Sequence, residues 1–291
     1  MKNFSLILSF MVLFVIAFVL QSFADTKVKE LKVTNNKSLS EEAVFIDNSS
    51  LILNVRRNKI DIVKKYINKG ADVNAKDDSG FFPLLIAVDN NNRDMVKLLI
   101  SAGADLNLKT GKIYGKSGIA DYGTALMYST KFGLYEMSKL LIDSGADLNI
   151  QNEYGKTALM IAAENGNEKL IKILVSKGAD VNIKTLDKMT ALSYAVRYDK
   201  IKIAKTLIAK GADVNNVQYH GKTPLIEATE NGYYEMVKLL ISKGADLKHK
   251  DNSYDTALDI AKRDRNIAVN KRMSITNIDK IVKLLEKANN N

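Results

Sequence analysis

Residues 221–246 read GKTPLIEATENGYYEMVKLLISKGAD, and this stretch decides the fold of the chain. It contains Thr223-Pro224-Leu225 near its start and ends with Gly244-Ala245-Asp246. Proline fits the first turn of a helix, because the backbone N–H groups of that turn have no partner within the helix in any case. Glycine commonly ends a helix. The stretch therefore predicts helical structure that starts near Pro224 and ends at Gly244.

The same unit recurs along the chain. Gly-Ala-Asp occurs six times, at successive spacings of 33, 42, 33, 33 and 33 residues. The interval from Thr223 to Gly244 also recurs, and the position at that distance before each glycine is most often Thr. A period of 33 residues held over several copies predicts a repeat architecture in which neighbouring units bury a continuous core. Thr256-Ala257-Leu258 opens a last unit that lacks the closing triplet. The triplets begin at Gly70, Gly103, Gly145, Gly178, Gly211 and Gly244.

Each unit is expected to hold two short helices. In the copy that follows Thr157, the apolar residues Leu159, Ala162, Leu170 and Leu174 lie at helical spacing in two blocks. Thr157 is a suitable N-cap for the first helix. Nine residues after the Thr position, six units carry Gly, Asn or Asp, the residues that best tolerate a left-handed conformation. The first helix of each unit is therefore expected to end just before that position.

This pattern resembles the ankyrin-repeat family. The resemblance covers about residues 46–291 and implies an all-α fold, a solenoid of paired short helices with finger loops and about seven repeats. The histidine that often follows Thr-Pro-Leu in the family is absent from every unit. In the sixth unit the matching residues are Gly221, Thr223-Pro224-Leu225, Ala228, Gly232, Val237-Lys238-Leu239-Leu240 and Gly244-Ala245-Asp246.

Three segments depart from the regular repeat. The 42-residue step indicates a loop insertion at 109–123, and insertions in repeat proteins map to loops on one face. The C-terminal repeat, 251–291, is atypical, with about 12 extra residues expected between its two helices around Arg263–Thr276. Residues 25–45 are expected to form an N-terminal linker or cap, because the terminal repeats of a solenoid face water on one side.

The N-terminus predicts export. Lys2 supplies a positive charge, Phe4–Leu20 is an uncharged apolar run, and Ser22 and Ala24 occupy the small-residue positions of a signal-peptidase site. These are the three parts of a secretory signal, so residues 1–24 are predicted to be a signal peptide and the protein to be periplasmic or secreted. An uncleaved N-terminal membrane anchor is the alternative. After cleavage, no stable membrane span is expected.

The composition excludes most catalytic and metal chemistry. The chain has no cysteine and two histidines, His220 and His249, which removes thiolate sites and most zinc and triad chemistry. Residues 110–117 read TGKIYGKS, but Thr110 stands where a phosphate-binding loop requires its first glycine. We therefore predict no catalytic residue, cofactor or metal site, and no enzymatic activity.

The resemblance to ankyrin repeats also implies a concave partner-binding surface made of finger tips and first helices. Aromatic residues and arginine are enriched in binding hot spots. The expected interaction is between a monomer of this chain and an unidentified protein partner. The predicted partner-binding residues are Phe81, Tyr154, Met189, Tyr219 and Lys222 on the fingers, and Arg56, Arg57, Lys131, Phe132, Arg197 and Tyr198 at the exposed ends of first helices.

Two functions are compatible with these observations. The first is a non-catalytic protein-interaction scaffold, and the alternative is an electrostatic binder of nucleic acid, anionic lipid or a cell-wall polymer. The formal charge of +10 favours the alternative. However, the lysines of the second helices, such as Lys97, Lys172 and Lys238, are interpreted as spread out rather than gathered in one stripe, so nucleic acid is not the expected partner.

Overall fold

The computed structural model describes residues 48–110, 112–115, 118–121, 123–270 and 276–290. The predicted signal peptide at 1–24 and the linker at 25–45 lie outside these residues. The described residues contain fourteen α-helices, which follow one another as seven pairs. The pairs are α2 (Asn48–Arg56) and α3 (Ile60–Asn68), α4 (Pro83–Asp89) and α5 (Arg93–Ser101), α6 (Ala125–Lys131) and α7 (Tyr135–Asp143), α8 (Ala158–Glu164) and α9 (Glu168–Ser176), α10 (Ala191–Arg197) and α11 (Ile201–Ala209), α12 (Pro224–Glu230) and α13 (Tyr234–Ser242), and α14 (Ala257–Asn270) and α15 (Thr276–Asn289).

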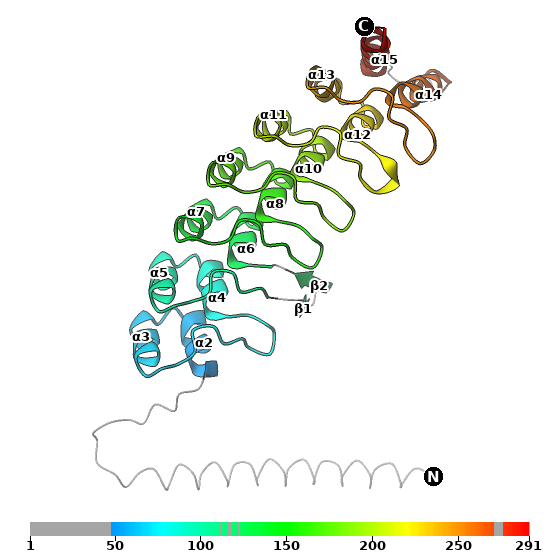
Figure 1. The fold of residues 1–291 in the computed structure, drawn as a ribbon. Coiled ribbons are helices and arrows are strands. Elements are labelled where there is room, and N and C mark those ends of the chain that lie inside the picture. Colours follow the sequence, from blue (N-terminus) through cyan, green and yellow to red (C-terminus); the bar gives the residue numbers. More distant parts are fainter. Residues whose placement is uncertain (1–47, 111, 116–117, 122, 271–275, 291) are drawn as a thin grey trace, which may run out of the picture. The chain divides into compact units, whose positions relative to one another are not determined.

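The pairs stack in chain order and form two layers (Figure 1). Each first helix contacts the first helix of the next pair, from α2 through α4, α6, α8, α10 and α12 to α14. The second helices lie behind them, with α7, α9, α11, α13 and α15 in consecutive contact. The loops that join one pair to the next project together on one side, and we call them the finger loops. This arrangement is the predicted solenoid, in which each unit packs on its neighbours.

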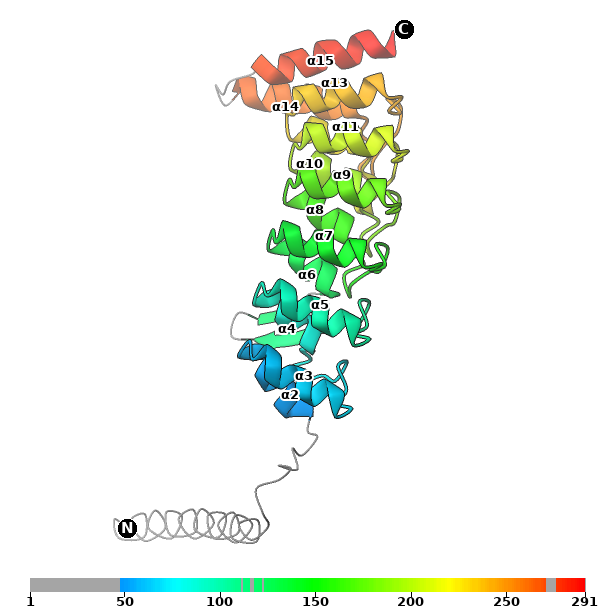
Figure 2. The same ribbon diagram turned by 90° about the vertical axis from the view of Figure 1, so that its left-hand side faces the viewer.

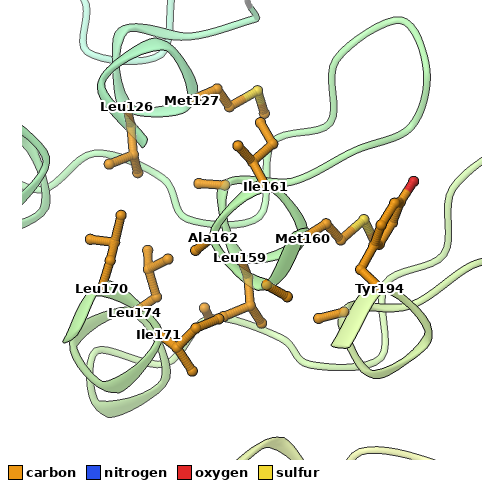
Figure 3. Close-up of a cluster of buried hydrophobic side chains, with 14 of the residues drawn as sticks. Leu126, Met127, Leu159, Met160, Ile161, Ala162, Leu170, Ile171, Leu174 and Tyr194 are labelled. Carbon is orange, nitrogen blue, oxygen red and sulfur yellow. The ribbon is translucent and has the colours of Figure 1, made fainter. Parts of the chain in front are cut away.

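The core lies between the two helix layers. Leu126 from α6 and Leu170 and Leu174 from α9 point toward one another beside α8, and Leu159 points from α8 toward Ile171 (Figure 3). All four leucines are almost fully buried. Six of the seven residues of α8 are buried, so this helix is apolar on nearly all sides. The second helices bury one stripe only and expose the other. In the middle pairs the first helix is therefore the inner one, apolar on most sides, and the second is the outer one, apolar on one side.

Except in the last pair, the first helices start and end where the sequence predicts. Thr157 caps α8, since its hydroxyl accepts a hydrogen bond from the backbone N–H of Met160 at 3.3 Å. Pro83 and Pro224 occupy the first position of α4 and α12. The positions that follow the first helices have positive φ angles at Asn58, Asn91, Gly133, Gly166, Asp199 and Gly232.

The inserted finger contains the described strands. β1 (Lys112–Gly115) pairs antiparallel with β2 (Gly118–Asp121), with Lys112 opposite Asp121 and Gly115 opposite Gly118. The repeats themselves are helical, which confirms the expected fold class. The insertion adds a short hairpin to one finger loop.

The last pair differs from the prediction. The extra residues were expected to form a connection around Arg263–Thr276, but α14 continues through Arg263 to Asn270. The reason is local: nine residues after Thr256 stands Arg265, where other first helices are followed by Gly, Asn or Asp. Without a residue that favours the left-handed conformation, nothing stops the helix at the usual place. The extra length therefore prolongs the helix.

An asparagine after most Gly-Ala-Asp triplets links one repeat to the next. Asn182 Nδ2 donates to the carbonyl oxygen of Gly211 at 3.0 Å, and Asn182 Oδ1 accepts from the backbone N–H of Asp213 at 2.9 Å. After the last triplet this position is Lys248, and the following unit has no triplet to bond. The bond from Asn Oδ1 to the next backbone N–H also occurs at Asn74, Asn107, Asn149 and Asn215.

Replacing Asn182 with alanine is expected to lower the free energy of unfolding by about 1–2 kcal/mol, because two inter-repeat hydrogen bonds are lost at an exposed site. Chemical denaturation followed by circular dichroism measures this loss. Lys248→Ala is the matched control at the same repeat position, and it should leave stability within about 0.5 kcal/mol. Equal effects of the two variants would show that the asparagine does not link the repeats.

Candidate functional site

An open groove of about 700 Å³ lies between finger loops and first helices in the third to fifth pairs. We call it the finger groove. It uses the end of α6, the outer turns of α8 and α10, and the finger loops that precede α8 and α10 (Figure 1). Its lining residues are Lys131, Asn152, Tyr154, Lys156, Ile161, Glu164, Asn165, Thr185, Asp187, Met189, Tyr194, Arg197 and Tyr198.

The floor of the finger groove is apolar and buried. It contains Ile161, Met189 and Tyr194, and Figure 3 shows the neighbouring Met160 extending toward the Tyr194 ring. The prediction that Met189 is an exposed finger residue is wrong, because its exposed fraction is 4%. Thr185 N donates to Met189 O at 2.9 Å, and Met189 N donates to Thr185 Oγ1 at 3.1 Å. These bonds close the finger and return the chain to the core.

Half-exposed aromatic rings lie in the lining of the finger groove and next to it. Tyr154 on the finger is 51% exposed, and Tyr198 at the end of α10 is 44% exposed. Phe132, which follows the groove residue Lys131, is 50% exposed, and its ring packs on Tyr128 with 4.5 Å between ring centres. About half of each of these three rings is therefore accessible to another molecule.

The lining of the finger groove includes a partly buried cation, Lys156. Lys156 Nζ lies 2.8 Å from Glu164 Oε2 and 4.6 Å from the centre of the Tyr194 ring. Burial alone lowers the pKa of Lys156, but the hydrogen bond to Glu164 and the electrostatic interactions with Tyr194 and Glu164 outweigh it, so this pKa lies above its ordinary value. Burial raises the pKa of the Tyr194 phenol. Lys156 therefore remains an ammonium group at neutral pH.

A second ion pair joins α10 to α12. Arg197 Nε donates to Glu227 Oε1 at 2.7 Å, and Gln218 Nε2 donates to Glu227 Oε2 at 3.0 Å. The side chain of Glu227 is 8% exposed, whereas that of Arg197 is 44% exposed. Burial lowers the pKa of Arg197, but the hydrogen bond and charge of Glu227 raise it further, so the guanidinium remains charged. One side of Arg197 thus faces the groove while its Nε is held by α12.

Five other predicted residues are outside the lining of the finger groove. Arg56 pairs with Asp77 and lies over the half-buried Phe81 ring, with 5.4 Å from its guanidinium carbon to the ring centre. Lys222 is held 2.6 Å from Glu230, and Tyr219 is 63% exposed on the short 3₁₀ turn η1 (Tyr219–Gly221). Arg57 is exposed just after α2. Of the eleven predicted residues, the groove brings together Lys131, Tyr154, Met189, Arg197 and Tyr198.

A family model described as "Ankyrin repeats (3 copies)" matches residues 19–110, 112–185 and 181–251. The chain belongs to the ankyrin-repeat family. A search of curated proteins found no match. Ankyrin repeats generally mediate protein–protein interaction, and the proteins that carry them are generally non-enzymatic scaffolds.

Sequence reasoning missed Lys156 and the carboxylates that pair with the cations of this ankyrin-repeat surface. Lys156 with Glu164, and Lys222 with Glu230, are pairs at the same eight-residue spacing across the N-cap threonine. That repeated spacing is a signal in the sequence that predicts both pairs. Glu227 gives no such signal, because its partner Arg197 belongs to the previous repeat.

The ankyrin repeats offer no separate metal centre in the described part of the chain, where no group of three or more His, Asp or Glu side chains is placed to hold a metal ion. Within the same residues, no helix has the length and apolar character needed to cross a membrane. The side chains that line the finger groove can take part in aromatic contact, hydrogen bonding and charge interactions.

Proposed function

We propose that this chain is a non-catalytic scaffold that binds a partner protein across the finger groove. The observation that carries the proposal is the pair of half-exposed rings of Tyr154 and Tyr198 in the groove lining, together with the half-exposed ring of Phe132 under the groove residue Lys131. Rigid aromatic side chains supply large contact area at a low loss of conformational entropy, and they are enriched in hot spots together with arginine.

The ionic groups support protein recognition over binding of a polyanion at this site. Lys156 is paired with Glu164, Arg197 is paired with Glu227, and Asp187 adds a carboxylate to the groove lining. The groove therefore combines both signs of charge with aromatic rings, which suits the mixed chemistry of a folded protein or peptide surface. A site for a polyanion requires an excess of cations.

We further propose that the seven helix pairs are seven ankyrin repeats and that the protein acts as a monomer outside the cytoplasm, in the periplasm or after secretion. The apolar run Phe4–Leu20 and the small residues Ser22 and Ala24 support export. Residues 1–24 are either a cleaved signal peptide or a retained membrane anchor. The mass of the N-terminal peptide, measured on the protein purified from its own cells, distinguishes these two cases. Cleavage gives Asp25 as the first residue, whereas a retained anchor keeps residues 1–24.

Replacing Phe132 and Tyr198 together with alanine tests the scaffold. Because both rings are about half exposed, helical content and the melting temperature should stay within a few degrees of the wild type. Retention of a partner protein from whole-cell and host extracts should fall at least tenfold, since hot-spot truncations remove about 2 kcal/mol or more. The measurement is quantitative affinity capture at low and at high salt.

Tyr254→Ala is the matched control, because Tyr254 is 80% exposed on the last finger loop, and that loop contributes no residue to the groove lining. It should keep the partner. Retention of the same protein by the double variant, or unfolding of that variant, would contradict the proposal. Capture of nucleic acid or lipid alone at low salt, with no protein retained through Phe132 and Tyr198, would favour the electrostatic alternative.

A further inference from the structure

The lysines of the second helices form one row along the solenoid, so the interpretation that they are spread out is wrong. In α3, α5, α7, α9, α11 and α13 the fifth residue is an exposed lysine, and in α15 the lysine after Val282 matches the one after Val237. Because the helices stack in register, equivalent positions align along the face that Figure 2 turns toward the viewer. The row is Lys64, Lys97, Lys139, Lys172, Lys205, Lys238 and Lys283.

Three consecutive second helices, α9, α11 and α13, together carry an excess of positive charge. We call these three helices, with the lysines that cap their C-termini, the basic face. It carries eight exposed lysines against the two acidic residues Glu168 and Glu235. Neighbouring second helices are about 8–10 Å apart, so the ammonium groups lie at similar intervals. The eight lysines are Lys169, Lys172, Lys177, Lys202, Lys205, Lys210, Lys238 and Lys243.

Most of this charge is not neutralised within the chain. Lys177 lies 3.0 Å from Asp143, and Lys202 lies 3.6 Å from Glu168. The other six lysines of the basic face have no ion-pair partner among the described residues. Like charges held this close raise the local potential and attract a polyanionic surface.

A shallow recess of about 240 Å³ lies between α9 and α11 on the same face. Lys172, Lys202 and Lys205 line it with Thr206, and Glu168, the partner of Lys202, is the one carboxylate in its lining. Three ammonium groups around a recess of this size suit a single phosphate-bearing headgroup.

We propose that the basic face docks on a bilayer surface rich in anionic phospholipid. The cations are all lysines, with no arginine in α9, α11 or α13, and α9 and α11 have no aromatic residue. Nucleic-acid sites rely on arginine forks, on aromatic stacking or on an element that enters a groove. A broad face made of the sides of stacked helices provides evenly spaced point charges, which match a plane of headgroups. The proposal does not depend on the finger groove.

Vesicle flotation with the full chain tests the proposal. Binding is compared between vesicles of phosphatidylglycerol and phosphatidylcholine, mixed in a ratio of one to two, and vesicles of phosphatidylcholine alone. The measured quantity is the difference in binding between the two kinds of vesicle. The apolar run Phe4–Leu20 is the same in every variant, so its contribution to binding cancels in this difference. The variant Lys172→Gln/Lys205→Gln/Lys238→Gln should lower the phosphatidylglycerol-dependent binding on the order of 100-fold, at about fivefold per lysine.

The control is Lys184→Gln/Lys248→Gln/Lys250→Gln, which removes the same charge from exposed lysines of the finger loops. It should lower the binding less than fivefold. Acetylation of lysines, read by mass spectrometry, should show protection of Lys172, Lys205 and Lys238 on anionic vesicles. Equal losses in both variants, no loss in either, or binding of an oligonucleotide in place of vesicles would each overturn the proposal. Success or failure of this proposal leaves the result expected for the Phe132 and Tyr198 double variant unchanged.

Discussion

Replacing Gly155 with valine is expected to destabilise the fourth and fifth repeats by about 3 kcal/mol or more, through backbone strain and overpacking together. Gly155 has a φ of +74°, and a Cβ at this position would lie 2.9 Å from both Leu186 N and Thr185 Cα. The left-handed backbone costs a β-branched residue about 1–3 kcal/mol. The collision is with backbone atoms of the next finger, which cannot rotate away, and overpacking adds about 1–3 kcal/mol.

Gly178→Val is the matched control for this substitution. Gly178 has a φ of +93°, and nothing lies within 4 Å of a Cβ built there. It should therefore lose the strain energy alone, and urea denaturation of both variants should place Gly155→Val lower in stability by about 1–3 kcal/mol. Lys188 occupies the position of Gly155 in the next finger and adopts a φ of +59° although it has a side chain. The positive φ alone therefore does not exclude a side chain at this position, and the contact with the next finger accounts for the larger loss expected for Gly155→Val. Equal losses in both variants would show that finger contact contributes nothing.

Replacing Arg197 with alanine is expected to lower the free energy of unfolding by about 2 kcal/mol, because it leaves a buried charged acceptor without its main donor. The Glu227 carboxylate stays buried with Gln218 as its remaining side-chain donor. Removing one partner of a fully buried pair costs about 3–5 kcal/mol. The loss here is smaller, because the Arg197 side chain is 44% exposed and was partly screened by water before its removal.

The double variant Arg197→Ala/Glu227→Gln tests the cause. A neutral amide can still bond with Gln218 and has no charge to desolvate, so the double variant should be more stable than Arg197→Ala by about 1 kcal/mol. Equilibrium denaturation at neutral pH measures both. A double variant no more stable than the single one would mean that Arg197 acts by packing. These stability measurements are made without a partner, so they report the structural role of Arg197 separately from any role in partner binding.

The repeat frame shows why some of the surface could be predicted and some could not. Phe132, Tyr154, Tyr198 and Tyr219 were predicted to be exposed and are exposed, because the position within the repeat determines whether a residue faces core or water. Met189 occupies a finger position, yet the hydrogen bonds with Thr185 close the finger and bury it. The repeat pattern assigns each position separately, so it does not predict a hydrogen bond between two segments of the same finger.

The same limit applies to contacts between repeats. The interpretation of the second-helix lysines failed because it read their separation along the chain, 33 residues in most steps, as separation in space. Stacking in register converts that separation into one helix spacing. The bond from Arg197 to Glu227 and the bond from Asn182 to Gly211 cross the same boundary between repeats.

The sequence alone determined the repeat period, the start of α8 after its N-cap Thr157, the start of α12 at Pro224, and the end of α8 before Gly166. The reason is that caps and turns depend on side chains within a few residues. The tertiary structure alone decided the finger groove, the burial of Met189 and Glu227, and the alignment of the lysine row. Each of these arises where one repeat meets the next, and the packing there depends on register, distance and dielectric environment rather than on local sequence.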